Sequence, residues 1–181
     1  EGGSFASSAK KREPTAARTF GRSIIISALD IDRTISTTNS KTITLTHAND
    51  APVLSPALVT TSYQSAPIAL NSLFAVTDID DTQLTSVSVQ FTGSTFITGE
   101  DLLQATVPAG LTQTFNLTTG ELSITGSASV SEYQNVLRSI RYSNLSSTPT
   151  QQNRTLRIRV ADLEDESNPA DVTLVISPPS A

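Results

Sequence analysis

The 181 residues contain 17 Asp and Glu, 12 Lys and Arg and no cysteine, so a disulfide framework and a thiolate metal site are both excluded. Residues 1–49 carry seven basic and four acidic residues, whereas residues 50–181 carry five basic and thirteen acidic ones. Because residues 50–181 are acidic and contain few basic residues, nucleic acid is not expected as a partner. No apolar run reaches the roughly 20 residues that membrane insertion requires.

The first part of the chain predicts a loop followed by a β-hairpin. Residues 1–22 are mostly polar and lack periodicity, residues 23–28 form a β-branched run, and Ile43 and Leu45 alternate with threonines. Asp30 and Asp32 fall in the turn region after the first of these two predicted strands. A hairpin of two strands is too small to be a domain.

The remainder of the chain predicts many short strands. Apolar residues alternate or form brief runs at 68–70, 73–76, 87–91, 122–124, 156–160 and 172–176, with turn residues between them. Residues 130, 133, 137 and 140 instead fall on one helical face, and Ser129 with Glu132 has the spacing of a capping box. The sequence therefore predicts an all-β sandwich with one short helix, which is followed by a strand at 139–142.

The end of the chain repeats the pattern of its beginning. Arg22 corresponds to Arg154 and Asp30 corresponds to Asp162, each pair being 132 residues apart. Internal similarity at a domain-sized spacing indicates tandem repeats. We therefore expect residues 1–48 to be the C-terminal portion of a preceding β-sandwich repeat, residues 49–54 to be an acidic linker, and residues 55–181 to be a complete repeat.

The residues that catalysis requires are scarce. The single histidine, His47, lies at the end of a predicted strand, no cysteine nucleophile exists, and no serine occupies a Gly-x-Ser-x-Gly turn. The acidic residues fall in turns and not in a predicted cleft. We expect that the protein is not an enzyme.

The acidic residues are the most informative feature. They cluster at the ends of predicted strands, at 30–32, 49–50, 78–81, 100–101 and 162–166, where the loops of one end of a sandwich converge. Crowded carboxylates repel one another without a cation, and calcium takes six to eight oxygen ligands. The alternative is that Asp and Asn form turns through local backbone hydrogen bonds. We expect solvated turns at 100–101 and 162–166, and we favour calcium for the linker with Asp78 and Asp80.

These motifs resemble the cadherin superfamily, and most closely the cadherin-like repeats of large secreted adhesins. The resemblance is carried by Asn49-Asp50-Ala51-Pro52, which is similar to the linker between repeats, and by Asp78-Ile79-Asp80, which is similar to the Asp-x-Asp pair after an early strand. It implies a cadherin or immunoglobulin-like Greek-key sandwich and a calcium site. The implied ligands are Asn49, Asp50, Asp78 and Asp80, with Asp30 and Asp32 as further candidates. The family's Leu-Asp-Arg-Glu motif has no match and the linker is shortened, so one calcium ion is expected where the family binds three.

Three Asn-x-Ser/Thr sequons, at Asn116, Asn144 and Asn153, predict N-glycosylation if the protein is secreted by a eukaryote. The leading functional prediction is an extracellular or cell-surface spacer repeat, stiffened by calcium and used in adhesion. Its partners would be adjacent repeats or neighbouring subunits, a cell-surface protein, or a glycan. One alternative is a filament subunit that is completed by strand pairing with a neighbouring chain. The other is a carbohydrate-binding sandwich, for which three Tyr, six Phe and no Trp provide few stacking platforms.

Overall fold

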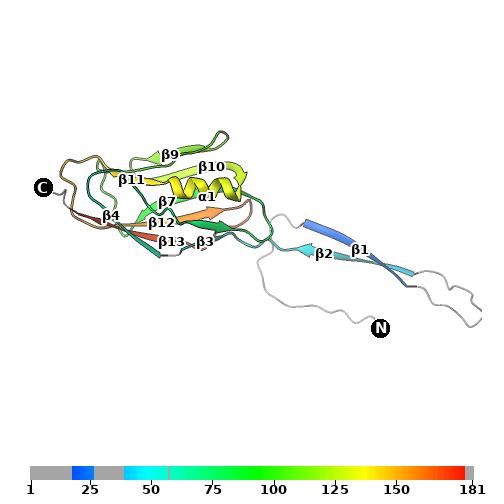
Figure 1. Ribbon diagram of the computed structural model, residues 1–181. Coiled ribbons are helices and arrows are strands. Elements are labelled where there is room, and N and C mark those ends of the chain that lie inside the picture. Colours follow the sequence, from blue (N-terminus) through cyan, green and yellow to red (C-terminus); the bar gives the residue numbers. More distant parts are fainter. Residues whose placement is uncertain (1–17, 27–38, 57, 178–181) are drawn as a thin grey trace, which may run out of the picture. The chain divides into compact units, whose positions relative to one another are not determined.

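The computed structural model describes residues 18–26, 39–56 and 58–177, and it divides into two compact units, Glu1–Asn49 and Asp50–Ala181 (Figure 1). We call them unit 1 and unit 2. Unit 1 contains the antiparallel strands β1 (Arg18–Ile26) and β2 (Asn39–His47). Arg22 of β1 is paired with Ile43 of β2, so the predicted hairpin is confirmed and each of its strands is longer than expected. The predicted turn residues Asp30 and Asp32 lie outside the described residues.

The larger sheet of unit 2 has six strands in the order β4-β13-β12-β7-β10-β9. Its strands are β4 (Leu58–Tyr63), β7 (Gln83–Thr92), β9 (Thr112–Asn116), β10 (Glu121–Ser129), β12 (Arg154–Ala161) and β13 (Ala170–Ile176). All neighbours are antiparallel except β4 and β13, which are parallel. The first long strand of unit 2 is therefore hydrogen-bonded to its last strand.

Shorter strands form the remaining sheets of unit 2. Strands β5 (Ile68–Ala69), β11 (Arg141–Asn144) and β8 (Asp101–Gln104) form one sheet, and β3 (Val53–Ser55) pairs with β6 (Ala75–Thr77) in another. The backbone N–H of Leu70, just after β5, donates to the carbonyl of Ile140 just before β11. The fold is thus mostly β-strand with one short helix, as predicted from the sequence.

The buried hydrophobic residues that the structure describes in unit 2 form one core between these layers. Inward residues alternate along the two C-terminal strands, with Leu156, Ile158 and Val160 buried on β12 and Val172 and Leu174 buried on β13. Burying each such side chain stabilises the fold by about 1.5–3 kcal/mol relative to leaving it exposed. Because adjacent residues on a strand face opposite sides of the sheet, this alternation fixes which face of the sheet is covered.

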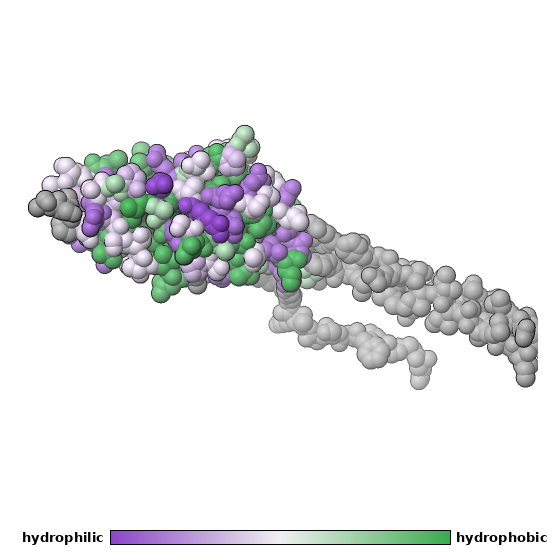
Figure 2. Space-filling model, in the orientation of Figure 1, coloured by the Kyte–Doolittle hydropathy of each residue, from purple (hydrophilic) through white to green (hydrophobic). Residues whose placement is uncertain are grey.

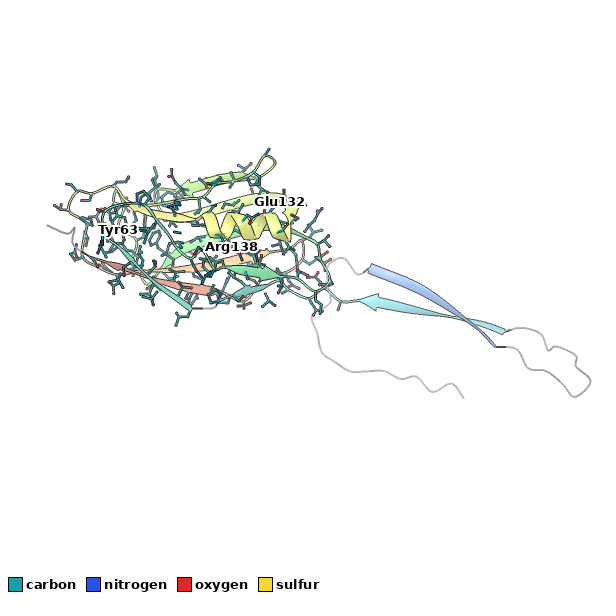
Figure 3. All side chains as sticks on the ribbon, in the orientation of Figure 1. Tyr63, Glu132 and Arg138 are labelled. Carbon is teal, nitrogen blue, oxygen red and sulfur yellow. The ribbon has the colours of Figure 1, made fainter. Side chains whose placement is uncertain are left out.

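The helix α1 (Val130–Ser139) forms where the capping box predicts it. The backbone N–H of Glu132 donates to Ser129 Oγ at 3.2 Å, and the backbone N–H of Ser129 donates to Glu132 Oε2 at 2.9 Å. Tyr133, Val136 and Leu137 form its buried face, and Figure 3 labels Glu132 and Arg138 near its two ends. Because the helix continues to Ser139, the strand expected at 139–142 begins at Arg141 instead. Within the described residues, no helix is both long and apolar enough to cross a membrane.

Candidate functional site at the acidic end of unit 2

Three segments meet at one end of unit 2, which we call the acidic end: the linker 50–54, the loop 78–82 and the loop 162–168. The pairing of Ser86 with Ala161 brings the start of β7 beside the end of β12, so the two loops leave the sheet at the same end. The pairing of Leu54 with Val76 brings the linker to the loop 78–82. The side chain of Asn168 binds both the backbone N–H and the carbonyl of Leu54, at 3.1 and 3.0 Å, which ties the third segment to the linker.

The loop 78–82 is organised by the side chain of Asp78. Its Oδ1 accepts hydrogen bonds from the backbone N–H groups of Asp80 and Asp81, at 3.1 and 2.8 Å. This is the local side-chain to backbone bonding that makes Asp a turn former. The loop therefore turns for the reason that the sequence predicts, and one Asp78 oxygen is already used in doing so.

The loop 162–168 repeats this geometry 84 positions later. Asp162 Oδ1 accepts hydrogen bonds from the backbone N–H groups of Glu164 and Asp165, at 2.6 and 2.7 Å. The middle residue of each motif is apolar and projects into solvent: Ile79 is 85% exposed and Leu163 is 81% exposed. Asp162 itself is 3% exposed, so the expectation of a solvated turn is wrong for this residue. Thr85 Oγ1 donates to its backbone carbonyl, which connects the loop to β7.

Two carboxylate oxygens at the acidic end are buried without a hydrogen-bond donor, namely Asp78 Oδ2 and Glu164 Oε2. Burial raises the pKa of the Asp78 carboxyl, while the N–H groups of Asp81 and Asp80 oppose this effect. The Asp80 side chain raises the pKa further, both by a hydrogen bond with the protonated Asp78 carboxyl and by its own negative charge. A buried anionic oxygen that lacks a partner carries an uncompensated desolvation cost. A cation at this oxygen would remove that cost.

The linker approaches the same loop through its backbone. The N–H of Asp50 donates to the Asp80 carboxylate, with distances of 3.2 and 3.4 Å to its two oxygens. Asp50, Asp78 and Ile79 are among the residues that line a cavity of about 610 Å³. A second cavity of about 460 Å³ lies between the loop 78–82 and the start of α1, and Asp78 lines it as well. Asp78 therefore lines two spaces that are large enough for solvent and ions.

The structure brings only some of the predicted calcium ligands together. Asp78 and Asp80 share one turn and Asp50 is bonded to Asp80, whereas Asn49 belongs to unit 1 and Asp30 and Asp32 lie outside the described residues. Throughout the part of the chain that the structure describes, no three His, Cys, Asp or Glu side chains gather closely enough to hold a metal ion. The donor chemistry suits a hard cation, and the side chains would have to move closer to bind one.

Glu100 and Asp101 lie at the opposite end of unit 2, which corrects the expectation that all the acidic clusters converge at one end. Arg154, which begins β12, is fully buried, and its Nε donates to the two Asp101 carboxylate oxygens at 3.0 and 2.9 Å. Asp101 also accepts from Tyr142 Oη at 2.6 Å and from the backbone N–H of Ile97 at 2.7 Å. The expected solvated turn is thus a buried ion pair.

The neighbouring Glu100 completes this network. Its carboxylate accepts hydrogen bonds from the backbone N–H and hydroxyl of Thr150, at 3.0 and 2.7 Å, and lies 3.4 Å from Arg154 Nη2. Burial raises the pKa of Glu100, but the Thr150 and Asn144 hydrogen bonds and the Arg154 charge outweigh it, so the pKa is lowered. Tyr63 packs edge-on against Tyr142 beside this network, far along the unit from Glu132 (Figure 3). Arg154 lies two residues before Leu156 and four before Ile158, so it faces the same buried side of the strand as they do. This position in the sequence could have indicated that a carboxylate is buried beside it.

The three sequons differ in accessibility. Asn116 and Asn153 are exposed, and Asn116 Oδ1 accepts the backbone N–H of Thr118 at 2.9 Å within a turn. Asn144 is partly buried, and its Nδ2, the atom that would carry a glycan, donates to Tyr142 Oη at 3.0 Å and to Glu100 at 3.3 Å. The fold therefore favours attachment at Asn116 and Asn153 over attachment at Asn144.

Comparison of the chain with protein-family models and with curated proteins found no match in either case.

Proposed function

We propose that unit 2 is a spacer repeat of an extracellular adhesion or structural protein, and that calcium bound at its acidic end stiffens the junction with the neighbouring repeat. The observation that carries this proposal is Asp78 Oδ2, a buried carboxylate oxygen without a donor, in a residue that lines two cavities. Calcium is the cation that suits such an oxygen-only donor set.

The strand order supports a cadherin or immunoglobulin-like Greek key. In that architecture one sheet contains the last two strands beside the third, and the other contains the first, second, fifth and fourth. Here β13, β12 and β7 are neighbours in the larger sheet, while β3 pairs with β6 and β5, β11 and β8 pair in that order. If β5 and β6 are two parts of one second strand, the two arrangements agree, and β4 and the β9–β10 hairpin are additions to the larger sheet.

The proposed ligands within unit 2 are Asp50, Asp78 and Asp80. Asp78 would contribute Oδ2 while its Oδ1 keeps the turn closed. Bound calcium would also offset the repulsion between the Asp78 and Asp80 carboxylates that contributes to the raised pKa of Asp78. If these ligands closed around an ion, they would hold the linker in one orientation relative to unit 2. A spacer requires such a rigid junction.

The test is calcium titration of the full chain by calorimetry and thermal unfolding, compared with Asp78→Asn. Asparagine keeps the oxygen that accepts the Asp80 and Asp81 N–H groups and removes the anionic Oδ2. The control is Asp165→Asn, an exposed acidic residue of the other loop at the same end. At a calcium concentration of about 100 times Kd, the wild type and the control should gain about 2.7 kcal/mol, and Asp78→Asn should gain much less. Absence of calcium binding by the wild type would refute the proposal.

The carbohydrate-binding alternative receives no support. Every aromatic side chain that the structure describes is buried or partly buried, and Phe96 packs against Phe91 and Phe115 with ring centroids 5.2 and 6.4 Å away. Figure 2 shows hydrophilic and hydrophobic residues interspersed over the visible face of unit 2. Sugar recognition by stacking requires an exposed aromatic face, which these residues do not offer.

A further inference from the structure

The hairpin of unit 1 has the same register as the last hairpin of unit 2. Arg22 is paired with Ile43, and Arg154 is paired with Leu174. The first members of these pairs are 132 positions apart and the second members are 131 apart, so the connection in unit 1 is longer by one residue. The sequence similarity aligned Arg22 with Arg154. The pairing shows in addition which residues of the second strands correspond, namely Ile43 and Leu174.

The residue types along the two hairpins agree as well. In unit 2 the buried positions of β12 begin with arginine and continue with Leu156 and Ile158. The register positions of β1 that correspond to them begin with Arg22 and continue with Ile24 and Ile26. On the last strand, the buried Leu174 and Ile176 correspond to Ile43 and Leu45 of β2. Two positions depart, since Lys41 corresponds to the buried Val172 and Asn39 corresponds to the buried Ala170.

The two hairpins differ in what flanks them. In unit 2, β12 pairs on its other side with β7 over seven residue pairs, and β13 pairs in parallel with β4 over six. In the part of unit 1 that the structure describes, β1 and β2 are paired only with each other. Among the described residues, neither strand of this hairpin has a partner on its other edge, and a two-stranded hairpin is at best marginally stable in water.

We infer that β1 and β2 are the last two strands of a second repeat with the fold of unit 2. The edges of this hairpin bind the remaining part of such a repeat: a strand equivalent to β7 pairs antiparallel with β1, and a strand equivalent to β4 pairs parallel with β2. The occupant is a polypeptide with the strand pattern of residues 50–153, and its β7-like and β4-like strands carry apolar residues on the face that they share with Ile24, Ile26, Ile43 and Leu45. The inference extends the proposed spacer function, because it defines the neighbouring repeat.

The test supplies this occupant from the protein itself. In a fusion, residues 50–153 are placed directly before residues 22–181, so that Arg22 follows Asn153 as Arg154 does in unit 2. Hydrogen exchange measured by mass spectrometry should show β1 and β2 amides exchanging at least about a hundredfold more slowly in the fusion than in the 1–181 chain. A second fusion that carries Lys41→Val removes the charged departure from the apolar pattern. Slow exchange in either fusion supports the inference, and fast exchange in both overturns it.

A matched pair of variants tests the register. Ile24 corresponds to the buried Leu156, whereas its neighbour Ile25 corresponds to Arg157, whose side chain is 44% exposed. In the slow-exchanging fusion, Ile24→Asp should restore fast exchange in β1 and β2, and Ile25→Asp should leave it slow. Equal effects of the two variants would overturn the proposed register. Protection in the 1–181 chain that increases with protein concentration would show pairing between copies of unit 1 instead. Because none of these readouts requires calcium, failure of the calcium proposal would leave them unchanged.

Discussion

The buried pair of Arg154 and Asp101 provides the sharpest stability test of the fold. Replacing Arg154 with methionine keeps an apolar side chain of similar length but leaves the Asp101 carboxylate buried without its counter-ion. Arg154 is fully buried and donates from Nε to both Asp101 oxygens, and its Nη1 donates to the carbonyls of Thr150 and Gln152. The variant therefore loses the pair and also leaves two backbone carbonyls without this donor.

The expected magnitude follows from burial. Breaking a buried ion pair by removing one partner costs about 3–5 kcal/mol, because the remaining charge is uncompensated. The same strand offers a control in Arg157→Met, which removes the pair with Asp171 at 2.8 and 3.0 Å. The side chains of Arg157 and Asp171 are 44% and 33% exposed, so this exposed pair should contribute only about 0–1 kcal/mol.

The assay is urea unfolding of the full chain at neutral pH, followed by circular dichroism. Arg154→Met should lower the free energy of unfolding of unit 2 by at least about 2 kcal/mol more than Arg157→Met lowers it. The double variant Arg154→Met with Asp101→Asn should be more stable than Arg154→Met alone, because it removes the uncompensated charge. Equal losses for the two arginine variants would refute the argument that burial determines the cost.

Three further outcomes are expected. Ser129→Ala should lower the free energy of unfolding by about 1 kcal/mol at neutral pH, and by less as pH falls below the usual carboxyl range. Hydrogen bonds from the Ser129 hydroxyl and then from its N–H lower the pKa of Glu132. The stabilisation is therefore present above the pKa that Glu132 has in the unfolded chain, and it disappears on acidification. An equal difference in stability between the wild type and Ser129→Ala at low pH would contradict this reasoning. Gly120→Ala should destabilise by about 1–3 kcal/mol more than Gly99→Ala, as measured by thermal unfolding, because both glycines have positive φ but only at Gly120 would a Cβ lie 2.5 Å from a phenylalanine ring. In a secreting eukaryotic host, mass spectrometry should find less glycan on Asn144 than on the other two sequons, and equal occupancy would contradict this expectation.

Local patterns predicted the elements that local interactions stabilise. The helix at 130–139 followed from the capping box of Ser129 and Glu132, and the strands β12 and β13 followed from strict alternation of apolar residues. Strands β3, β4, β8 and β9 were not predicted. Of these, β4 is defined by parallel pairing with a strand more than 100 residues away, and β9 has few buried side chains. Their assignment as strands depends on partners that sequence periodicity does not reveal.

The site residues divide in the same way. The turns at Asp78 and Asp162 follow from the side-chain chemistry of aspartate, which acts over two or three residues. The pairing of Asp101 with Arg154 spans 53 positions and depends on how β8 and β12 cross the sandwich, so sequence spacing alone assigned Asp101 to the wrong end. The unpartnered oxygen of Asp78 likewise results from tertiary burial, which no motif specifies.

The parallel contact between β4 and β13 has a mechanical consequence. Tension applied to the two termini of unit 2 would pull β4 and β13 in opposite directions along their common axis. The six residue pairs that join them would then bear the load together, whereas a hairpin pulled open at one end loses its bonds one after another. A unit connected in this way should resist stretching until most of the contact fails at once, a property suited to a chain that transmits force between two anchored points.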